Sequence, residues 1–220
     1  MSEFTQTYKK YLSDSPYMAS VALGVFLLVA SFIINYYAGL YATEIASNYV
    51  NDIILNNIPV FDVDVIFVYG PLVMWVMVAA ICIRKPQAIP FVLKSIALFV
   101  LIRSLFITLT HLGPFPDQLQ IETGVNLVRK FTFGGDLFFS GHTGSPFLMA
   151  VIFWNNRRLR FIFTAIAILF GTVVLLAHLH YSIDVLAAFF ITYTIAHMAE
   201  HFFKADHEIF KNGLSSPHES

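Results

Sequence analysis

The sequence predicts an all-α protein, a polytopic membrane helix bundle of six transmembrane helices with both termini in the cytoplasm. Of its 220 residues, 57% are hydrophobic and 12% are charged, and the mean hydropathy is +0.70. A soluble domain carries roughly 25% charged residues, so lipid is the expected solvent. Six apolar segments qualify, or nearly qualify, as membrane spans of about 20 residues. The basic residues fall mainly on one side of these segments.

The six predicted spans are joined by polar connections. The first follows Lys9 and Lys10, as the apolar part of a signal peptide would. It is longer than the ~7–15 residues of such a part, and no clear cleavage site follows it, so we expect a retained helix. A membrane domain is predicted over residues 1–204, followed by a disordered, polar cytoplasmic tail over residues 205–220. The spans cover approximately residues 17–41, 65–83, 88–110, 140–155, 159–177 and 181–203.

Basic residues orient the predicted bundle, because cytoplasmic loops carry an excess of Lys and Arg. With the N-terminus inside, the outer loops hold only Arg129 and Lys130, while Lys94 and Arg103 fall within the third span. The other nine basic residues lie on the inner side and are Lys9, Lys10, Arg84, Lys85, Arg157, Arg158, Arg160, Lys204 and Lys211. This bias predicts that both termini are cytoplasmic.

Charge and cysteine content exclude some classes of function. A net charge of −1 argues against a nucleic-acid partner. The single cysteine, Cys82, supports neither a disulfide framework nor a metal-thiolate cluster. The same orientation gathers the polar groups at the starts of the fourth and sixth spans at the outer face, together with the acidic residues of the outer loops, which are Glu44, Asp52, Asp62, Asp64, Asp117, Glu122 and Asp136.

His180 and Asp184 stand four residues apart at the start of the sixth span. On a helix this spacing stacks both side chains on one face. The carboxylate can then accept a hydrogen bond from one imidazole nitrogen and leave the other free to attack or to take a proton. A charge at this depth is costly unless it is paired or faces water. The alternative is a His–Asp pair that only caps the helix.

The fourth span begins at Ser140-Gly141-His142. Ser140 suits the N-cap position, and a helix N-terminus beginning there offers free N–H groups and a positive dipole end to an anion. His142 would lie in the first turn, where it can donate to that anion. The alternative is a turn of Ser and Gly with an incidental histidine.

Arg103 lies in the outer half of the third span. A lone arginine in a span is a functional-site hypothesis, and its planar fork suits a phosphate or carboxylate. The alternative is a structural ion pair with an acidic residue of an outer loop. Two histidines, an aspartate, an arginine and a helix N-terminus at one membrane face together form an inventory for phosphoryl transfer.

The motifs that carry these residues resemble those of sphingomyelin synthases, which belong with the type-2 phosphatidic acid phosphatases. Residues 135–143 (GDLFFSGHT) look like the third signature of these synthases, and residues 177–185 (AHLHYSIDV) look like the fourth. The stretch from Arg103 to Pro116 is similar to their Arg-led second signature. The resemblance extends over most of the chain from the third span onward.

The resemblance implies a reaction and its residues. His180 would be the nucleophile that forms a phospho-histidine intermediate, Asp184 would activate it, and His142 would serve the leaving group. We expect the substrate to contact Arg103, Asp136, Ser140, Gly141 and Tyr181. A phosphocholine or phosphoethanolamine headgroup would pass from a glycerophospholipid to ceramide or diacylglycerol, with no metal or cofactor. The alternatives are a lipid phosphatase or phospholipase C that uses water as the acceptor, and a non-catalytic channel or scaffold.

The chain departs from the family patterns in two places. The first phosphatase motif separates its Lys and Arg by six residues, whereas eight separate Lys94 from Arg103 and Ser104 follows where the motif has Pro. Nine steps place Lys94 about 13 Å below Arg103, so we expect Lys94 to snorkel toward the cytoplasmic face. The extra cytosolic domain and the longer third outer loop of animal synthases are missing, which is typical of a bacterial form. We therefore expect a bacterial inner membrane with a periplasmic site, or a Golgi or plasma membrane in a eukaryote.

Some features remain open at this level. His197-Met198-Ala199-Glu200-His201 fits the inverted zincin pattern, H-x-x-E-H, but it lies near the cytoplasmic end and lacks an obvious third ligand. The sequence does not decide whether the chain forms homo-oligomers. It also does not assign roles to Glu122, Arg129, Lys130 and His178.

Overall fold

In the computed structural model, residues 3–121 and 135–214 are described, and the regular elements among them are all helices. The predicted all-α class is therefore confirmed for this part of the chain. The elements are α1 (Glu3–Leu12), α2 (Ser15–Glu44), η1 (Leu55–Asn57), α3 (Asp64–Arg84), η2 (Pro86–Ala88), α4 (Ile89–Leu109), α6 (Gly141–Ile152), α7 (Arg157–Leu176), α8 (Ser182–Phe202) and α9 (Lys204–Asn212).

Five helices of the described residues are long and apolar enough to cross a membrane, which supports an integral, multi-pass membrane protein. They are α2, α3, α4 extended by η2, α7 and α8, and they match five of the six predicted spans. The remaining predicted span, the fourth, corresponds to α6, which has only 12 residues. At 1.5 Å per residue α6 is about 18 Å long, too short to cross by itself. A sixth crossing and the sidedness of the termini therefore stay predictions.

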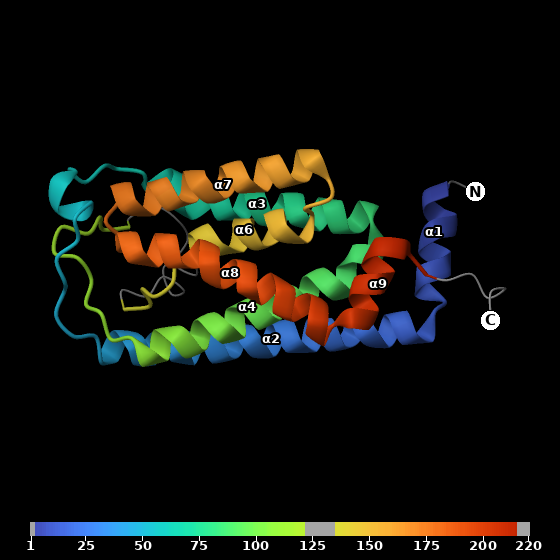
Figure 1. Cartoon of the computed structure of the whole chain (residues 1–220). Coiled ribbons are helices and arrows are strands. Elements are labelled where there is room, and N and C mark those ends of the chain that lie inside the picture. Colours follow the sequence, from blue (N-terminus) through green and yellow to red (C-terminus); the bar gives the residue numbers. More distant parts are fainter. Residues whose placement is uncertain (1–2, 122–134, 215–220) are drawn as a thin grey trace.

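The long helices run along a common axis, with the long connecting loops at one end and both termini at the other (Figure 1). The short helix α6 packs against both α7 and α8, while α4 packs against both α2 and α8. The interior is apolar and close-packed around the buried residues Phe91, Phe139, Leu148, Met149, Phe163 and Ile195. α6 therefore begins inside the bundle, at the end where the loops converge, which we call the loop end.

Local sequence explains where the spans begin. Asp14 caps α2 by accepting a hydrogen bond from the Tyr17 N–H at 2.7 Å, and Asn156 caps α7 in the same way through Leu159 at 3.1 Å. Large apolar side chains on the outer faces remain exposed, as expected where lipid is the solvent. Among them are Phe26, Phe32, Val73, Phe161, Ile168 and Phe190.

The prediction of a disordered tail is corrected by a helix at the end of the bundle that carries both termini. Residues 204–212 form α9, whereas disorder was expected from residue 205. Asp206 and His207 on α9 are buried, because α9 folds back over the ends of the spans instead of entering water. Helix α1, which no sequence pattern predicted, lies across the bundle axis at this end (Figure 1).

Lys94 is a second correction. Its ammonium group does not snorkel to the interface but is buried, with its side chain 7% exposed. It forms an ion pair with Asp206 of α9 at 2.6 Å and donates to the Ser20 hydroxyl at 2.7 Å. The prediction was wrong because it treated residues beyond 204 as unfolded, so it had no partner to offer a buried ammonium group.

Candidate active site

The starts of α6 and α8 meet at the loop end, although some 40 residues separate them in sequence. The backbone N–H of Ser140 donates to the backbone carbonyl of Asp184 at 3.2 Å. This contact brings together the two segments that carry the predicted histidines and aspartate. Both helices begin inside the bundle, where Ser140 and Asp184 have 0% exposure. The backbone amides of these first turns therefore lie in a protected environment.

Ser140 acts as the N-cap that the sequence predicts for α6. Its hydroxyl oxygen accepts from the Thr143 N–H at 3.4 Å and from the Thr143 hydroxyl at 3.2 Å. Gly141 follows as the first helical residue, and a Cβ atom there would lie 3.2 Å from Nε of Arg103. The lack of a side chain at Gly141 therefore allows the guanidinium of α4 to lie directly against the N-terminus of α6.

Arg103 holds the segment before α6 through three hydrogen bonds. Its Nε donates to the Phe139 carbonyl at 3.0 Å, and its Nη2 donates to the Asp136 carbonyl at 2.7 Å and to the Asp136 carboxylate at 3.1 Å. The ion pair with an outer-loop acid, which was the alternative to substrate binding, is therefore present. Within residues 3–121 and 135–214, no hydrogen bond uses Nη1. The fork can thus keep its place and still donate to a substrate oxygen.

His180 and Asp184 lie beside each other, as expected, although His180 stands in the turn before α8 and not on the helix. The distance from Nδ1 of His180 to Oδ2 of Asp184 is 3.5 Å, longer than a formed hydrogen bond. Nδ1 has no hydrogen-bond partner among the described residues. Oδ2 of Asp184 accepts from the Tyr181 N–H at 2.9 Å, so the carboxylate also caps the start of α8. Catalytic hydrogen bonds are often long without substrate and tighten when it binds.

His142 lies in the first turn of α6, where its ring stacks on Phe67 of α3 with a centroid distance of 4.2 Å. It directly follows Gly141, which lies against the guanidinium of Arg103. The stacking fixes the imidazole plane beside the N-terminus of α6. The structure therefore brings His142, His180, Asp184 and Arg103 to one place at the loop end.

Tyr181 does not fit its predicted contact with substrate. Its side chain is 1% exposed, and its hydroxyl donates to the Gly113 carbonyl at 2.8 Å and accepts from the Val50 N–H at 3.3 Å. A buried hydroxyl with both roles filled has little left for a ligand. Tyr181 instead fastens two outer loops to the start of α8.

Asp52, an outer-loop acid with no predicted role, binds the start of α8 next to the site. One carboxylate oxygen accepts from the backbone N–H and the hydroxyl of Ser182 at 2.7 and 2.8 Å. The other accepts from the N–H groups of Ile54 and Leu55 at 2.8 and 3.1 Å. Burial alone would raise the pKa of Asp52, but these four hydrogen bonds outweigh it and hold the pKa below its ordinary value of 3.8. Only its acidity and its place before a span could have marked it in the sequence.

One part of the chain resembles a known family, and it runs from the segment before α6 to the end of α8. Residues 134–202 are similar to the C-terminal domain of the PAP2 superfamily. The match covers about a third of the chain and supports a relationship to the type-2 phosphatidic acid phosphatases. His142, His180 and Asp184 lie inside this PAP2-like segment, whereas Arg103 lies outside it. No curated protein and no solved structure matches the chain.

The H-x-x-E-H motif does not assemble a metal site. Nδ1 of His197 lies 2.9 Å from the Tyr193 carbonyl, and Glu200 faces His207 of α9 at 3.7 Å. Among the described residues, no group of three or more His, Cys, Asp or Glu side chains could hold a metal ion. The zinc-protease alternative therefore has no structural support.

Proposed function

We propose that this protein is a membrane lipid headgroup phosphotransferase that moves phosphocholine or phosphoethanolamine from a glycerophospholipid to ceramide or diacylglycerol. The observation that carries the proposal is the junction of α6 and α8, where Ser140 bonds to Asp184 and Arg103 lies against Gly141. This junction gathers a nucleophile, its orienting carboxylate, a second histidine and an anion-binding helix start. The PAP2-like match over the same segment is in keeping with chemistry on lipid phosphates.

Substrate phosphate is held first. The Nη1 donors of Arg103 and the backbone N–H groups at the start of α6 supply positive charge to the non-bridging phosphate oxygens. The macrodipole of α6 adds to this field. Asp136 keeps the guanidinium in place through its 3.1 Å ion pair, so the donors need little reorganisation. Preorganised donors of this kind stabilise the charge that develops during phosphoryl transfer.

Transfer then takes two steps. Nε2 of His180 attacks phosphorus while the bond from phosphorus to the diacylglycerol oxygen breaks, and His142 gives that oxygen a proton. Asp184 moves the short distance needed to accept from Nδ1 of His180 and stabilises the ring as it becomes charged. In the second step the hydroxyl of ceramide or diacylglycerol attacks phosphorus, His142 takes its proton, and the bond to His180 breaks. General acid–base catalysis of this kind contributes about 10²–10⁴-fold to a rate.

Hydrolysis is the second candidate function. The similarity to phosphatases favours it, because water could replace the lipid hydroxyl in the second step with the same residues. The product would then be a free phosphate ester or phosphate, with no second lipid.

An acceptor-dependence experiment separates the two. Purified full-length protein in lipid nanodiscs is incubated with headgroup-labelled phosphatidylcholine or phosphatidylethanolamine, with and without ceramide and diacylglycerol. Labelled product lipid that forms only with an acceptor supports transfer. Label released into water at the same rate without an acceptor supports hydrolysis and contradicts the transferase proposal.

A further inference from the structure

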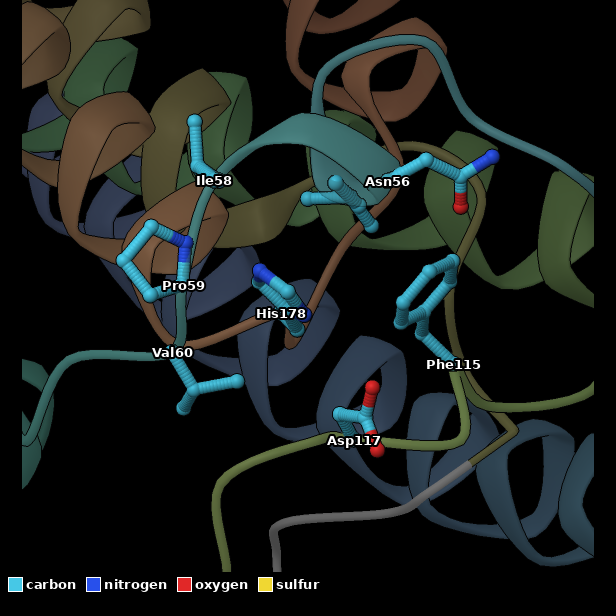
Figure 2. Close-up of a pocket in the computed structure, with 8 residues that line it drawn as sticks. Asn56, Ile58, Pro59, Val60, Phe115, Asp117 and His178 are labelled. Atoms are coloured by element: carbon cyan, nitrogen blue, oxygen red, sulfur yellow. The ribbon is translucent and has the colours of Figure 1, made fainter.

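A pocket opens at the loop end beside the turn between α7 and α8, with a volume of about 500 Å³. Figure 2 shows His178 in the middle of the lining residues, between Pro59 on one side and Phe115 on the other, with Asp117 also beside it. The lining comes from three separate segments of chain. Its residues are Leu55, Asn56, Ile58, Pro59, Val60, Phe115, Asp117 and His178.

Main-chain hydrogen bonds hold the pocket walls to the turn. The Leu119 N–H donates to the Ala177 carbonyl at 3.0 Å, and the Phe61 N–H donates to the Leu176 carbonyl at 2.9 Å. These bonds fix the segments that carry Asp117 and Pro59 on either side of His178. The pocket is therefore part of the folded structure and does not depend on loose side chains.

His178 is the unusual residue of this pocket. Its side chain is 3% exposed, yet neither ring nitrogen has a hydrogen-bond partner among the described residues. Buried polar groups are nearly always paired, so an unpaired imidazole needs an explanation. The backbone of His178 also has a φ of +54°, a left-handed conformation that non-glycine residues adopt infrequently and that tends to occur at functional sites. Phe115 packs edge-on against the ring at 5.1 Å, but it offers no hydrogen-bonding group.

Charge narrows the class of ligand. Asp117 is the only acidic residue in the lining, and the lining includes no Lys or Arg among the described residues. An anion would therefore meet a carboxylate without any compensating cation. A cation that carries N–H donors suits the pocket, because it can donate to the Asp117 carboxylate and to an imidazole nitrogen of His178. A trimethylammonium group has no N–H and would leave His178 unpaired.

We propose that this pocket binds a primary ammonium group, and that it receives the ammonium end of a phosphoethanolamine headgroup. The second part rests on the function proposed above. His178 and His180 are two residues apart, so their Cα atoms lie within about 7 Å. In this proposal, a headgroup whose phosphorus lies at His180 extends its amine past the adjacent turn toward Asp117. His178 and Asp117 act in this account as specificity residues and take no part in the chemical steps.

Turnover of two donor lipids tests the lipid assignment. The wild-type chain is expected to use phosphatidylethanolamine with a kcat/KM about tenfold above that of phosphatidylcholine. Asp117→Asn and His178→Gly, where glycine accepts the positive φ, are expected to lower the phosphatidylethanolamine value about tenfold and leave phosphatidylcholine unchanged. Asp62→Asn is the matched control, because this exposed loop carboxylate does not line the pocket. Equal losses for both lipids, or no change in their ratio, would overturn the proposal.

A binding measurement separates failure of this inference from failure of the proposed function. Glycerophosphoethanolamine, glycerophosphocholine and free ethanolamine are titrated into the full-length protein in micelles while the ¹⁵N signals of His178 are followed. We expect the two primary amines to shift these signals in the wild type but not in Asp117→Asn, and glycerophosphocholine to have no effect. This result without turnover of any lipid would refute the proposed function and retain the ammonium site. No shift with either amine would refute the site even in an active enzyme. Binding without a lipid preference in turnover would assign the site to soluble amines and overturn its assignment to the headgroup.

Discussion

Arg103 joins the structural and the chemical roles of the site in one side chain. Its Nε and Nη2 hold Asp136 and Phe139, and these bonds place the segment that leads into α6. Its remaining donors face the substrate in the proposed mechanism. Only a rigid fork can do both, because an ammonium group is a single point with no fixed directions.

Arg103→Lys is therefore expected to lower kcat about 100-fold, the scale seen when one preorganised donor to a reacting oxygen is lost. The measurement is the steady-state rate with the preferred donor lipid. Arg158→Lys at the start of α7, far from the loop end, is the matched control and should keep its activity. A kcat within about twofold of wild type for Arg103→Lys would show that its fork serves packing alone.

Asp184→Asn distinguishes an orienting carboxylate from a simple helix cap. The amide oxygen can still accept from the Tyr181 N–H, so α8 should begin normally and the unfolding temperature should change little. The amide cannot stabilise a charged His180, so kcat should fall by roughly 10²–10⁴-fold. A variant that loses stability but keeps its rate would support the capping alternative.

At the scale of single residues, short spacing in sequence predicted which side chains meet, but not the local structure that brings them together. His180 and Asp184 do lie together in the structure, but His180 stands in the turn before α8, so the path of this turn and not helical spacing alone brings it to Asp184. The pairing of Arg103 with Asp136 could be named only as a class, an outer-loop acid. The bonds from Asp52 to Ser182 span 130 positions and depend on the path of a whole loop, so no local pattern reveals them.

The N-terminus of α8 is the element on which the site depends most. Its first residues are fastened by Asp52 from the first outer loop and by the Tyr181 hydroxyl bond to Gly113. The carboxylate of Asp52 also lies favourably at the positive end of the helix dipole. These contacts fix His180 and His178 together, because both lie in the turn that leads into α8.

Asp52 should give the fold a stability that depends on pH. Its pKa is lowered in the folded state, so its contribution is fully present above the unfolded value, about 3.8, and is lost as pH falls through the lower folded value. Asp52→Asn is expected to cost about 1–3 kcal/mol at pH 6. Below pH 4 the difference from wild type should shrink. Unfolding temperatures measured in detergent from pH 6 to pH 3 test this, and a difference that does not vary with pH would contradict it.

Helix α9 closes the opposite end of the bundle through the buried pair of Lys94 and Asp206. Lys94→Met leaves the carboxylate buried without its cation, and we expect a loss of about 3–5 kcal/mol in unfolding free energy. The double variant Lys94→Met/Asp206→Leu should recover most of that loss, because it removes both charges. Chemical unfolding of the single and double variants measures both values. Equal stability of the single variant and wild type would show that water or another group replaces the pair.

In the whole molecule, the proposed catalytic groups lie at the opposite end from the short helices that close the bundle. The proposed catalytic groups and the ammonium pocket lie at the loop end, whereas α1, α9 and both termini lie at the other end (Figure 1). The long apolar runs predicted α2, α3, α4, α7 and α8, because a span needs only length and hydropathy. The short helices α1 and α9 were missed because polar helices of about ten residues depend on tertiary contacts. One such contact is the bond from Lys10 Nζ to the Leu214 carbonyl at 2.9 Å.

The most direct test of the central claim is a search for the phospho-histidine. Full-length protein is mixed rapidly with phosphorus-labelled donor lipid without an acceptor, quenched in alkali and digested for mass spectrometry. The account predicts acid-labile label on His180, none in His180→Ala, and discharge of the label when the acceptor lipid is added. Turnover at the wild-type rate in His180→Ala, or label found on His142 instead, would contradict it.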